Sequence, residues 1–366
     1  MKHFDSLEVK NKKIPLPAFF PDATFGYVRG VNSKDLINCK INGVVVNIYH
    51  LMKKNLIEKI KRRRGIHKYM NFDGIIISDS GGFQVMSLIH SNPKNGKIYD
   101  DKIVFKLDDE KNKKITLTPE LCVRMQFEIG SDIIMCLDDC TYPDMGLEDQ
   151  EKSVERTIAW ACRCKNEFDR LTKNLKANER PLIFGIIQGG KNLKLREKCA
   201  DAMKKIGFDG YAFGGWPVED GRFLYELLKY TANLMPKDMP KYAMGVGKPE
   251  DIVYCVKLGY NMFDCVIPTR EARNNRLYEF KTNFFRKLKK LDNKGKFYQY
   301  VRVRNLKYKD DKSPISKNCD CYACRNFSKS DIYKLFKNKD KESIRLTTIH
   351  NLKFYSHLME RLQKDN

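Results

Sequence analysis

Three closely spaced cysteines near the end of the chain form the most specific chemical pattern in the sequence. Cys319, Cys321 and Cys324 make a C-x-C-x-x-C motif, and two histidines, His350 and His357, follow it. Three thiolates and one imidazole are the ligands of a closed tetrahedral zinc site, the kind that stabilises a fold and leaves no position open for substrate. Because the remaining cysteines are scattered, we predict a structural zinc ion here rather than a disulfide framework.

Polar residues at the ends of short apolar runs form a second candidate site. They are Asp79, Asp138, Gln188, Gly215 and Asp264. A single Asp after a strand is usually a helix cap or a turn residue. Three acids and an amide at the same end of one sheet would instead form a functional site.

These residue types suit chemistry on a nucleoside. Of two carboxylates in one cavity, one can attack the anomeric carbon while the other transfers a proton to the leaving group. A third carboxylate can accept N1-H and N2-H of guanine, and an amide or a backbone N-H can donate to O6. Phe83 and Met244 are candidates for packing on the faces of the base, although residues of both types are more often buried in a core.

The elements that must position these residues are short apolar runs, each followed by a longer helical pattern, which is typical of βα units. Strands are predicted at residues 18–23, 43–47, 74–79, 132–138, 182–188, 210–214, 241–245 and 262–267, and helices at 53–64, 119–128, 148–171, 193–206, 222–234 and 248–257. Eight such units match the usual size of a closed (β/α)8 TIM barrel, an α/β fold of roughly 250 residues. We disfavour a doubly wound open sheet, because no glycine-rich phosphate turn follows the first strand.

Two stretches interrupt this repeat. Residues 84–118 are too long for a βα loop and contain alternating segments at 102–107 and 113–117, which predicts an inserted β-hairpin around the turn at 108–111. Residues 271–366 follow the eighth strand and contain the cysteine motif. We therefore divide the chain into a catalytic barrel, residues 1–270, and a zinc-binding subdomain, residues 271–366, that packs on it.

The charge of the chain favours a polyanionic partner. Its 366 residues include 69 Lys and Arg against 46 Asp and Glu, a net charge of +23. Residues 270–366 alone hold 26 basic and 11 acidic residues, so the basic surface is concentrated where the zinc motif lies. A genome rich in A and T would also enrich Lys and Asn, which is the alternative explanation for the charge.

Composition also limits the class of protein. Hydrophobic residues make up 42% of the chain, which excludes a disordered protein. The sequence has no apolar run of about 18 residues and no signal peptide at its start, so we expect a soluble cytoplasmic protein without a membrane anchor.

Four segments resemble the queuine-type tRNA-guanine transglycosylases, and the resemblance runs in order from about residue 15 to residue 362. The segments are SDSGGFQ at 78–84, GIIQGG at 185–190, MGVGKP at 244–249 and FDCVIPTR at 263–270. The resemblance implies a (β/α)8 barrel with a zinc subdomain. It also implies an enzyme that exchanges guanine at the wobble position in the tRNA anticodon loop for a 7-deazaguanine base.

The resemblance assigns a role to each candidate residue. Asp264 matches the nucleophile that forms a covalent RNA-enzyme intermediate, and Asp79 matches the general acid and base. Asp138 matches the residue that reads the guanine-like edge. The remaining matches are Gln188 and the Gly215 N-H as O6 donors, Phe83 and Met244 as the stacking pair, Arg270 and Arg273 as RNA-binding residues, and His350 rather than His357 as the fourth zinc ligand.

The sequence departs from the family pattern after Gly215, where it reads Trp216-Pro217. Pro217 has no N-H, so this peptide can present only a carbonyl to the pocket. A carbonyl suits a cationic aminomethyl group, and Cys140 matches the bacterial form of the family. We therefore predict that the prequeuosine base (7-aminomethyl-7-deazaguanine) is preferred over queuine, with Trp216 lining the base pocket.

Residues 20–23 (FPDA) depart from the family pattern, and the chain stops soon after a helix predicted at 351–362. The resemblance implies a homodimer, to which that end of the chain contributes in relatives. Three rival functions are a paralogue that inserts a deazaguanine into DNA, a noncatalytic zinc-binding subunit that only supports an active partner, and a noncatalytic RNA-binding barrel. The second rival would be expected to lack one of the two working acids, yet Asp79 and Asp264 are both present.

Overall fold

The computed structural model describes residues 4–107, 114–142, 145–281 and 297–365, and its centre is an eight-stranded parallel sheet. The strands are β3 (Ala18–Pro21), β4 (Gly43–Asn47), β5 (Ile75–Asp79), β9 (Ile133–Met135), β10 (Leu182–Ile187), β11 (Gly210–Phe213), β14 (Lys241–Ala243) and β15 (Met262–Cys265). From β4 onward, each barrel strand pairs in parallel with the next barrel strand along the chain, and β15 pairs with β3. An isolated bridge between Asp22, directly after β3, and Val45 of β4 completes the circle. The predicted (β/α)8 barrel and all eight predicted strands are confirmed.

The barrel strands form because β-branched and aromatic side chains are buried on both of their faces. One apolar cluster fills the interior of the barrel and includes Phe20, Ile77, Phe184 and Tyr242. An antiparallel hairpin, β1 (Ser6–Val9) with β2 (Lys12–Pro15), contributes Leu7, Val9, Ile14 and Leu16 to the same cluster. The hairpin therefore closes one end of the barrel, and the carboxyl ends of the strands open at the other.

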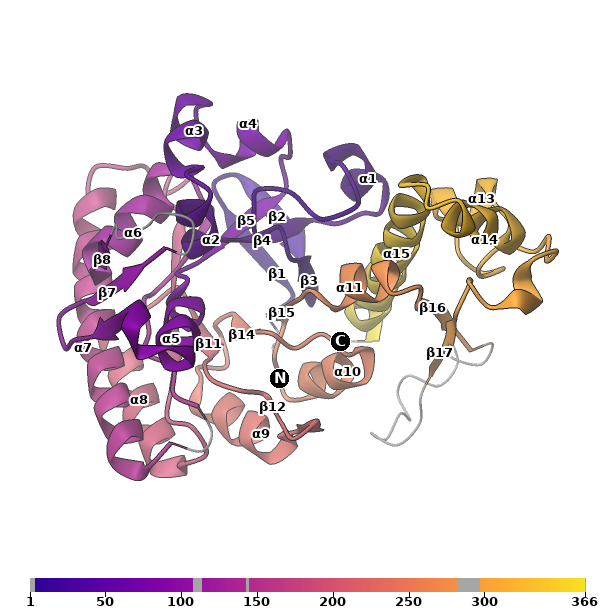
Figure 1. Cartoon of the computed structure of the whole chain (residues 1–366). Helices are drawn as coiled ribbons and strands as arrows, with labels where there is room; N and C mark the ends of the chain where they lie inside the picture. Colours follow the sequence, from indigo (N-terminus) through magenta and orange to yellow (C-terminus); the bar gives the residue numbers. More distant parts are fainter. Residues whose placement is uncertain (1–3, 108–113, 143–144, 282–296, 366) are drawn as a thin grey trace.

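Helices surround the sheet on its outer side (Figure 1). They are α1 (Ser33–Asn38), α2 (Ile48–Lys53), α3 (Ile57–Arg62), α4 (Ile66–Met70), α5 (Gly82–Ser91), α6 (Pro119–Glu128), α7 (Leu147–Thr172), α8 (Leu193–Ile206), α9 (Tyr225–Leu234), α10 (Pro249–Lys257) and α11 (Ile267–Arg273). The predicted bounds of α6 are correct at both ends. Its start is fixed by Pro119 in the first turn and by the Thr118 hydroxyl, which accepts a hydrogen bond from the Leu121 N-H at 3.2 Å.

Two helix predictions are wrong in detail. The segment predicted as one helix at 53–64 is divided, because Asn55 adopts a left-handed conformation between α2 and α3. The predicted start of the helix at residue 222 is wrong as well. Arg222–Phe223 form strand β13, which pairs with β12 (Val218–Glu219), and α9 begins at Tyr225.

The inserted segment is an antiparallel sheet with one strand more than predicted. The hairpin is confirmed as β7 (Ile103–Lys106) paired with β8 (Lys114–Leu117), and β6 (Gly96–Ile98) adds a third strand after a short helix, η1 (Pro93–Asn95). The predicted turn at 108–111 lies outside the described residues. Helix α5 precedes this sheet and was not predicted.

The chain after α11 forms a group of elements beside the barrel (Figure 1). They are β16 (Leu277–Phe280), β17 (Tyr298–Val301), η3 (Leu306–Tyr308), α13 (Tyr322–Asn326), α14 (Lys329–Lys337) and α15 (Glu342–Asp365). Helix α15 contacts α13, α14 and β16 on one side and β3, α1, α10 and α11 on the other. Helix α15 therefore packs between the C-terminal group and the barrel.

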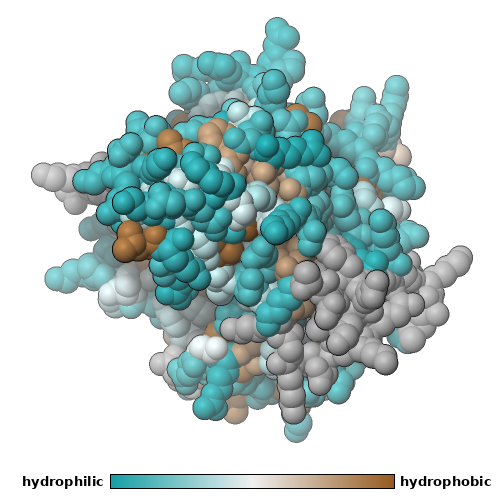
Figure 2. Space-filling model, turned by 90° about the vertical axis from the view of Figure 1, so that its right-hand side faces the viewer, coloured by the Kyte–Doolittle hydropathy of each residue, from teal (hydrophilic) through white to brown (hydrophobic). Residues whose placement is uncertain are grey.

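The surface of this side of the molecule is mostly hydrophilic, with small hydrophobic areas scattered over it (Figure 2). Among the described residues, no helix is both long enough and apolar enough to cross a membrane.

Candidate active site

One cavity at the carboxyl ends of the strands contains every predicted base-binding and catalytic residue. Its volume is about 260 Å³. Its lining includes Asp79, Phe83, Asp138, Gln188, Gly215, Trp216, Met244 and Asp264. The carboxyl groups of the third and eighth barrel strands, Asp79 on β5 and Asp264 on β15, thus share a cavity although 185 residues separate them in the sequence.

Asp79 is the last residue of β5, and a tight turn follows it. Gly81 has φ of +80°, and a Cβ there would lie 2.8 Å from the backbone nitrogen of Tyr49, so this turn requires glycine. The Asp79 carboxylate accepts hydrogen bonds from the Gly81 N-H and from the Asn47 side chain. Burial, with additional repulsion from Asp138 and Asp264, nevertheless raises the pKa of Asp79 from 3.8 to about 7.

Asp264 lies on β15 and faces the loop after β14. The Gly245 N-H donates to its Oδ1 at 2.9 Å, and the Tyr242 hydroxyl also hydrogen-bonds to the carboxylate. Burial raises the pKa of Asp264 to about 6, and these two donors limit the increase. At pH 7 Asp264 is therefore mostly ionised, whereas Asp79 is about half protonated.

Asp138 and Gln188 form a polar pair at the base of the cavity. Gln188 Nε2 lies 2.6 Å from Asp138 Oδ2, and the two residues are only 2% and 8% exposed. Burial raises the pKa of Asp138 to about 6 despite the hydrogen bond from Gln188. A carboxylate beside an amide provides the acceptor and donor that the edge of a guanine-like base requires.

Aromatic rings form one wall of the cavity. The Phe83 and Trp216 ring centroids lie 5.0 Å apart, and Trp216 stacks on Tyr142 at 5.4 Å. The Trp216 indole N-H donates to the Thr141 carbonyl at 3.2 Å, which ties the loop after β11 to the loop after β9. Met244 also lines the cavity, so apolar groups flank the polar pair.

The cysteine motif and a histidine converge in the C-terminal group. The ligand atoms of Cys319, Cys321, Cys324 and His350 all lie within 4.8 Å of one another. His350 Nδ1 lies 3.2 Å from the Cys324 sulfur, while Nε2 lies 2.7 Å from the Tyr278 carbonyl. A carbonyl acceptor for the second ring nitrogen is typical of a histidine that binds a metal, so this set can hold a tetrahedral ion. His357 instead pairs with Asp320 at 3.0 Å.

Comparison with known proteins agrees with this geometry. The model of the family described as queuine tRNA-ribosyltransferase matches residues 3–365. The chain belongs to this family. Among curated proteins named queuine tRNA-ribosyltransferase, it is 38% identical over 356 residues to that of Psychrobacter sp. (97% of this chain, 87% of the relative) and 39% identical over 352 residues to that of Haemophilus ducreyi (96% and 85%).

In this queuine tRNA-ribosyltransferase family member, Arg270 and Arg273 lie outside the cavity, on helix α11 directly after β15. The Arg270 side chain is 53% exposed. Arg273 is half-buried, and burial together with the nearby Arg29 lowers the pKa of its guanidinium group. The two arginines follow Asp264 closely in the sequence, but neither of them lines the cavity.

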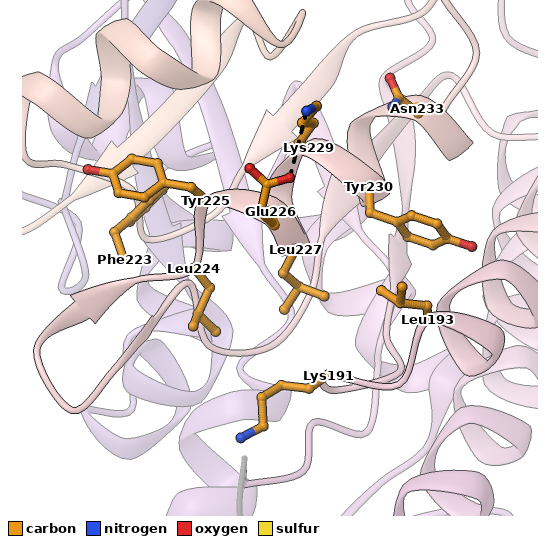
Figure 3. A pocket seen from close by; sticks show the side chains of 10 residues that line it. All are labelled: Lys191, Leu193, Phe223, Leu224, Tyr225, Glu226, Leu227, Lys229, Tyr230 and Asn233. Atoms are coloured by element: carbon orange, nitrogen blue, oxygen red, sulfur yellow. Dashed lines mark ion pairs between the residues drawn. The ribbon is translucent and has the colours of Figure 1, made fainter. Parts of the chain in front are cut away.

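A larger cavity, about 690 Å³, lies between α9 and the start of α8 (Figure 3). Its lining includes Lys191, Leu193, Tyr225 and Tyr230, together with an ion pair between Glu226 and Lys229 at 3.7 Å. None of the predicted catalytic or base-binding residues lines it. Cavity size alone would thus have pointed away from the acids.

Sequence reasoning missed three residues that support the site. Asn47 holds the Asp79 carboxylate, Tyr242 hydrogen-bonds to Asp264, and Arg196 lies behind the polar pair with a fully buried guanidinium group. Asn47 could have been found, because it ends a predicted strand as Asp79 does. Tyr242 lies within a strand and Arg196 lies on a helix, so nothing in their spacing marks them.

Proposed function

We propose that this chain is a tRNA-guanine transglycosylase, a pentosyltransferase that exchanges guanine at the wobble position of tRNA for a 7-deazaguanine base. One observation carries the proposal: Asp79 and Asp264 share a single cavity of about 260 Å³ with the Asp138–Gln188 pair. That arrangement supplies two acids for a displacement at a ribose carbon and a polar edge for one purine. Family membership over nearly the whole chain supports the same activity.

The different pKa values of the two acids suit different roles in this reaction. Asp264, ionised at pH 7, attacks C1′ of the ribose as the bond from C1′ to the guanine breaks. Asp79, whose pKa of about 7 keeps much of it protonated, gives its proton to the departing guanine. In the second half the Asp79 carboxylate takes a proton from the incoming base, which attacks C1′ and releases Asp264.

The remaining lining residues recognise the base. The Asp138 carboxylate accepts N1-H and N2-H, while the Gln188 amide and the Gly215 N-H donate to O6. Phe83 and Met244 cover the faces of the ring. Such contacts require a nucleotide that has left its stack, which fits an anticodon loop and not a base inside a duplex.

We propose that the incoming base is the prequeuosine base and not queuine. Pro217 cannot donate a hydrogen bond, and its own carbonyl already accepts the Leu224 N-H at 2.9 Å. The Trp216 carbonyl is then the group of this peptide that can accept a hydrogen bond from an aminomethyl cation. The stacked rings of Trp216 and Tyr142 also occupy space on this side of the cavity, which favours a base with a small substituent.

Three further properties follow from the same assignment. Zn²⁺ held by Cys319, Cys321, Cys324 and His350 would be structural, because four protein ligands leave no open position. Arg270 and Arg273 would contact the RNA beside the exchanged nucleotide. The enzyme would act in the cytoplasm and as a homodimer.

The test is to trap the covalent intermediate. The protein is incubated with tRNA and 7-deazaguanine base and then run on a denaturing gel. We expect a protein–RNA complex with the wild-type chain, none with Asp264→Asn, and slow or blocked formation with Asp79→Asn. Asp73→Asn is the matched control, because Asp73 is exposed and lies just before the start of β5, at the opposite end from Asp79. A complex that survives in Asp264→Asn would refute the assignment of the nucleophile.

Two comparisons test the substrates. Labelled guanine should enter tRNA but not single-stranded or duplex DNA of the same sequence, and the reverse result would favour the DNA-acting alternative. With guanine-labelled tRNA, the prequeuosine base should displace the label faster than queuine does. Faster displacement by queuine would overturn the argument from Trp216 and Pro217.

A further inference from the structure

Arg196, on the first turn of α8, has a fully buried guanidinium group. It is 0% exposed and stacks on the Phe213 ring at 4.4 Å. Within the part of the chain that the structure describes, it forms no ion pair with a carboxylate; its donors all go to main-chain carbonyl groups. Although burial lowers its pKa to about 10, the group remains a cation at neutral pH. A buried cation held only by carbonyl groups is costly, so its position requires an explanation.

The carbonyl groups that it binds are those directly before the two predicted O6 donors. Arg196 Nη1 donates to the Ile187 carbonyl at 3.1 Å, and Ile187 precedes Gln188. Arg196 Nη2 donates to the Gly214 carbonyl at 3.0 Å, and Gly214 precedes Gly215. A third bond, from Nε to the Gly190 carbonyl at 2.8 Å, fixes the turn after Gln188. One planar group thus spans the ends of β10 and β11.

The bond to Gly214 also acts on a single peptide group. The Gly214 carbonyl and the Gly215 N-H belong to the same amide, so a cation on its oxygen polarises the N-H and makes it a stronger donor. Gly215 has φ of +99°, and a Cβ there would lie 3.4 Å from Nη2, so the guanidinium lies directly against this residue. Fixed geometry and added polarity both favour an oxygen acceptor on the cavity side.

We propose that Arg196 is a positioning residue for base recognition, which holds Gln188 and the Gly215 amide toward the purine O6 and strengthens the Gly215 N-H as a donor. This inference rests on the proposed function, in which those two groups bind O6. It assigns no contact between Arg196 and the base. Arg196 should therefore increase the binding affinity of purines that have an oxygen at position 6. It should have little effect on the affinity of purines that lack this oxygen.

The test compares equilibrium binding of guanine with that of 2-aminopurine, which lacks O6. Arg196→Lys keeps the charge but cannot reach two carbonyl groups as a planar fork does. We expect it to weaken guanine binding about tenfold and 2-aminopurine binding less than about twofold, so that discrimination between the bases falls. Arg180→Lys is the matched control, because Arg180 also stacks on a ring, Phe168 at 4.7 Å, but lies at the opposite end of β10. It should change neither value.

Several outcomes would overturn the inference. Equal weakening for both bases in Arg196→Lys would indicate a merely structural role, and no weakening would indicate no role. Phe213→Leu, which removes the ring below the guanidinium but keeps the charge, should show a smaller selective loss, and this variant decides the question if Arg196→Lys does not fold. Equal wild-type affinities for the two bases would also contradict the inference.

Failure of the proposed function gives a different pattern. A wild-type chain that binds guanine selectively through Arg196 but never exchanges labelled guanine into tRNA would refute the transglycosylase and retain the inference. If the wild-type chain exchanges guanine in tRNA but Arg196→Lys weakens the binding of both bases equally, the transglycosylase is retained and the inference about Arg196 is refuted. A wild-type chain that binds no guanine would refute both.

Discussion

Asp79→Asn should make the protein more stable above neutral pH while it removes activity. Burial and the neighbouring Asp138 and Asp264 raise the pKa of Asp79 from 3.8 to about 7 in the folded chain. The folded state therefore keeps a proton that the unfolded state releases. The contribution of the Asp79 carboxyl group to folding stability is fully present below about pH 4 and is lost progressively as the pH rises to about 7.

The magnitude follows from the two pKa values. Each tenfold change in proton affinity corresponds to about 1.4 kcal/mol, so ionised Asp79 destabilises the fold by up to about 4 kcal/mol at pH 8. Asparagine has the same shape and no charge, and its oxygen can still accept the hydrogen bond from Asn47. The Gly81 N-H would lose its carboxylate acceptor at a cost of about 1 kcal/mol. We expect a net gain of roughly 2–3 kcal/mol at pH 8 and none at pH 4.

Denaturant unfolding of both proteins at pH 4, 6 and 8 measures this difference. The gain should grow between pH 4 and pH 7 and then remain constant, whereas the exposed control Asp73→Asn should show no such trend. A stability difference that is the same at all three pH values, or a variant less stable than wild type at pH 8, would show that Asp79 is not destabilised by its surroundings. The prediction would then fail together with the assignment of Asp79 as a proton donor near neutral pH.

Three further predictions follow from the site and its surroundings. The rate of covalent complex formation per unit of free enzyme should rise as Asp264 ionises near pH 6 and fall as Asp79 loses its proton near pH 7; a flat profile from pH 5 to 9 would contradict these roles. A strong chelator should release about one zinc ion per chain and lower the melting temperature, and Cys321→Ser should bind less zinc; metal analysis that finds no ion would refute the site. The double variant Arg270→Ala with Arg273→Ala should weaken tRNA binding and leave guanine binding unchanged. The slope of the logarithm of the tRNA binding constant against the logarithm of salt concentration should fall in magnitude by about two, and an unaltered slope would place both residues outside the RNA contact.

The fold was predictable because each barrel strand is a short apolar run, and burial on both faces leaves little choice of residue. Boundaries were less predictable where a local conformation decides them. Asn55 interrupts a helical pattern by adopting a left-handed conformation, and Arg222–Phe223 pair as a strand although their sequence continues into α9. Neither event has a strong signal in side-chain periodicity.

The site was predictable to the extent that its residues end strands. Asp79, Gln188 and Asp264 lie at or beside the last positions of β5, β10 and β15, where a barrel gathers functional groups. Arg196 does not follow this rule, because its side chain reaches the strand ends from a helix. A basic residue in the first turn of a helix normally faces solvent, and the burial of Arg196 follows from packing between β10 and β11 that no local sequence pattern marks.

Helix α15 connects the cluster of three cysteines and His350 to the end of the barrel where Asp79 and Asp264 lie. It contains His350 and also Tyr355, whose hydroxyl donates to the Gly247 carbonyl at 2.6 Å, in the same loop as the Gly245 N-H that binds Asp264. Asn351 Nδ2, between them, donates to the Pro268 carbonyl at 3.0 Å at the start of α11. Because Arg345 also fixes this helix to Asp35 at 2.6 Å, α15 keeps contacts with the barrel that do not depend on a metal. Loss of the ion should therefore loosen α13 and the cysteine loop first, and reach Asp264 only when α15 itself moves.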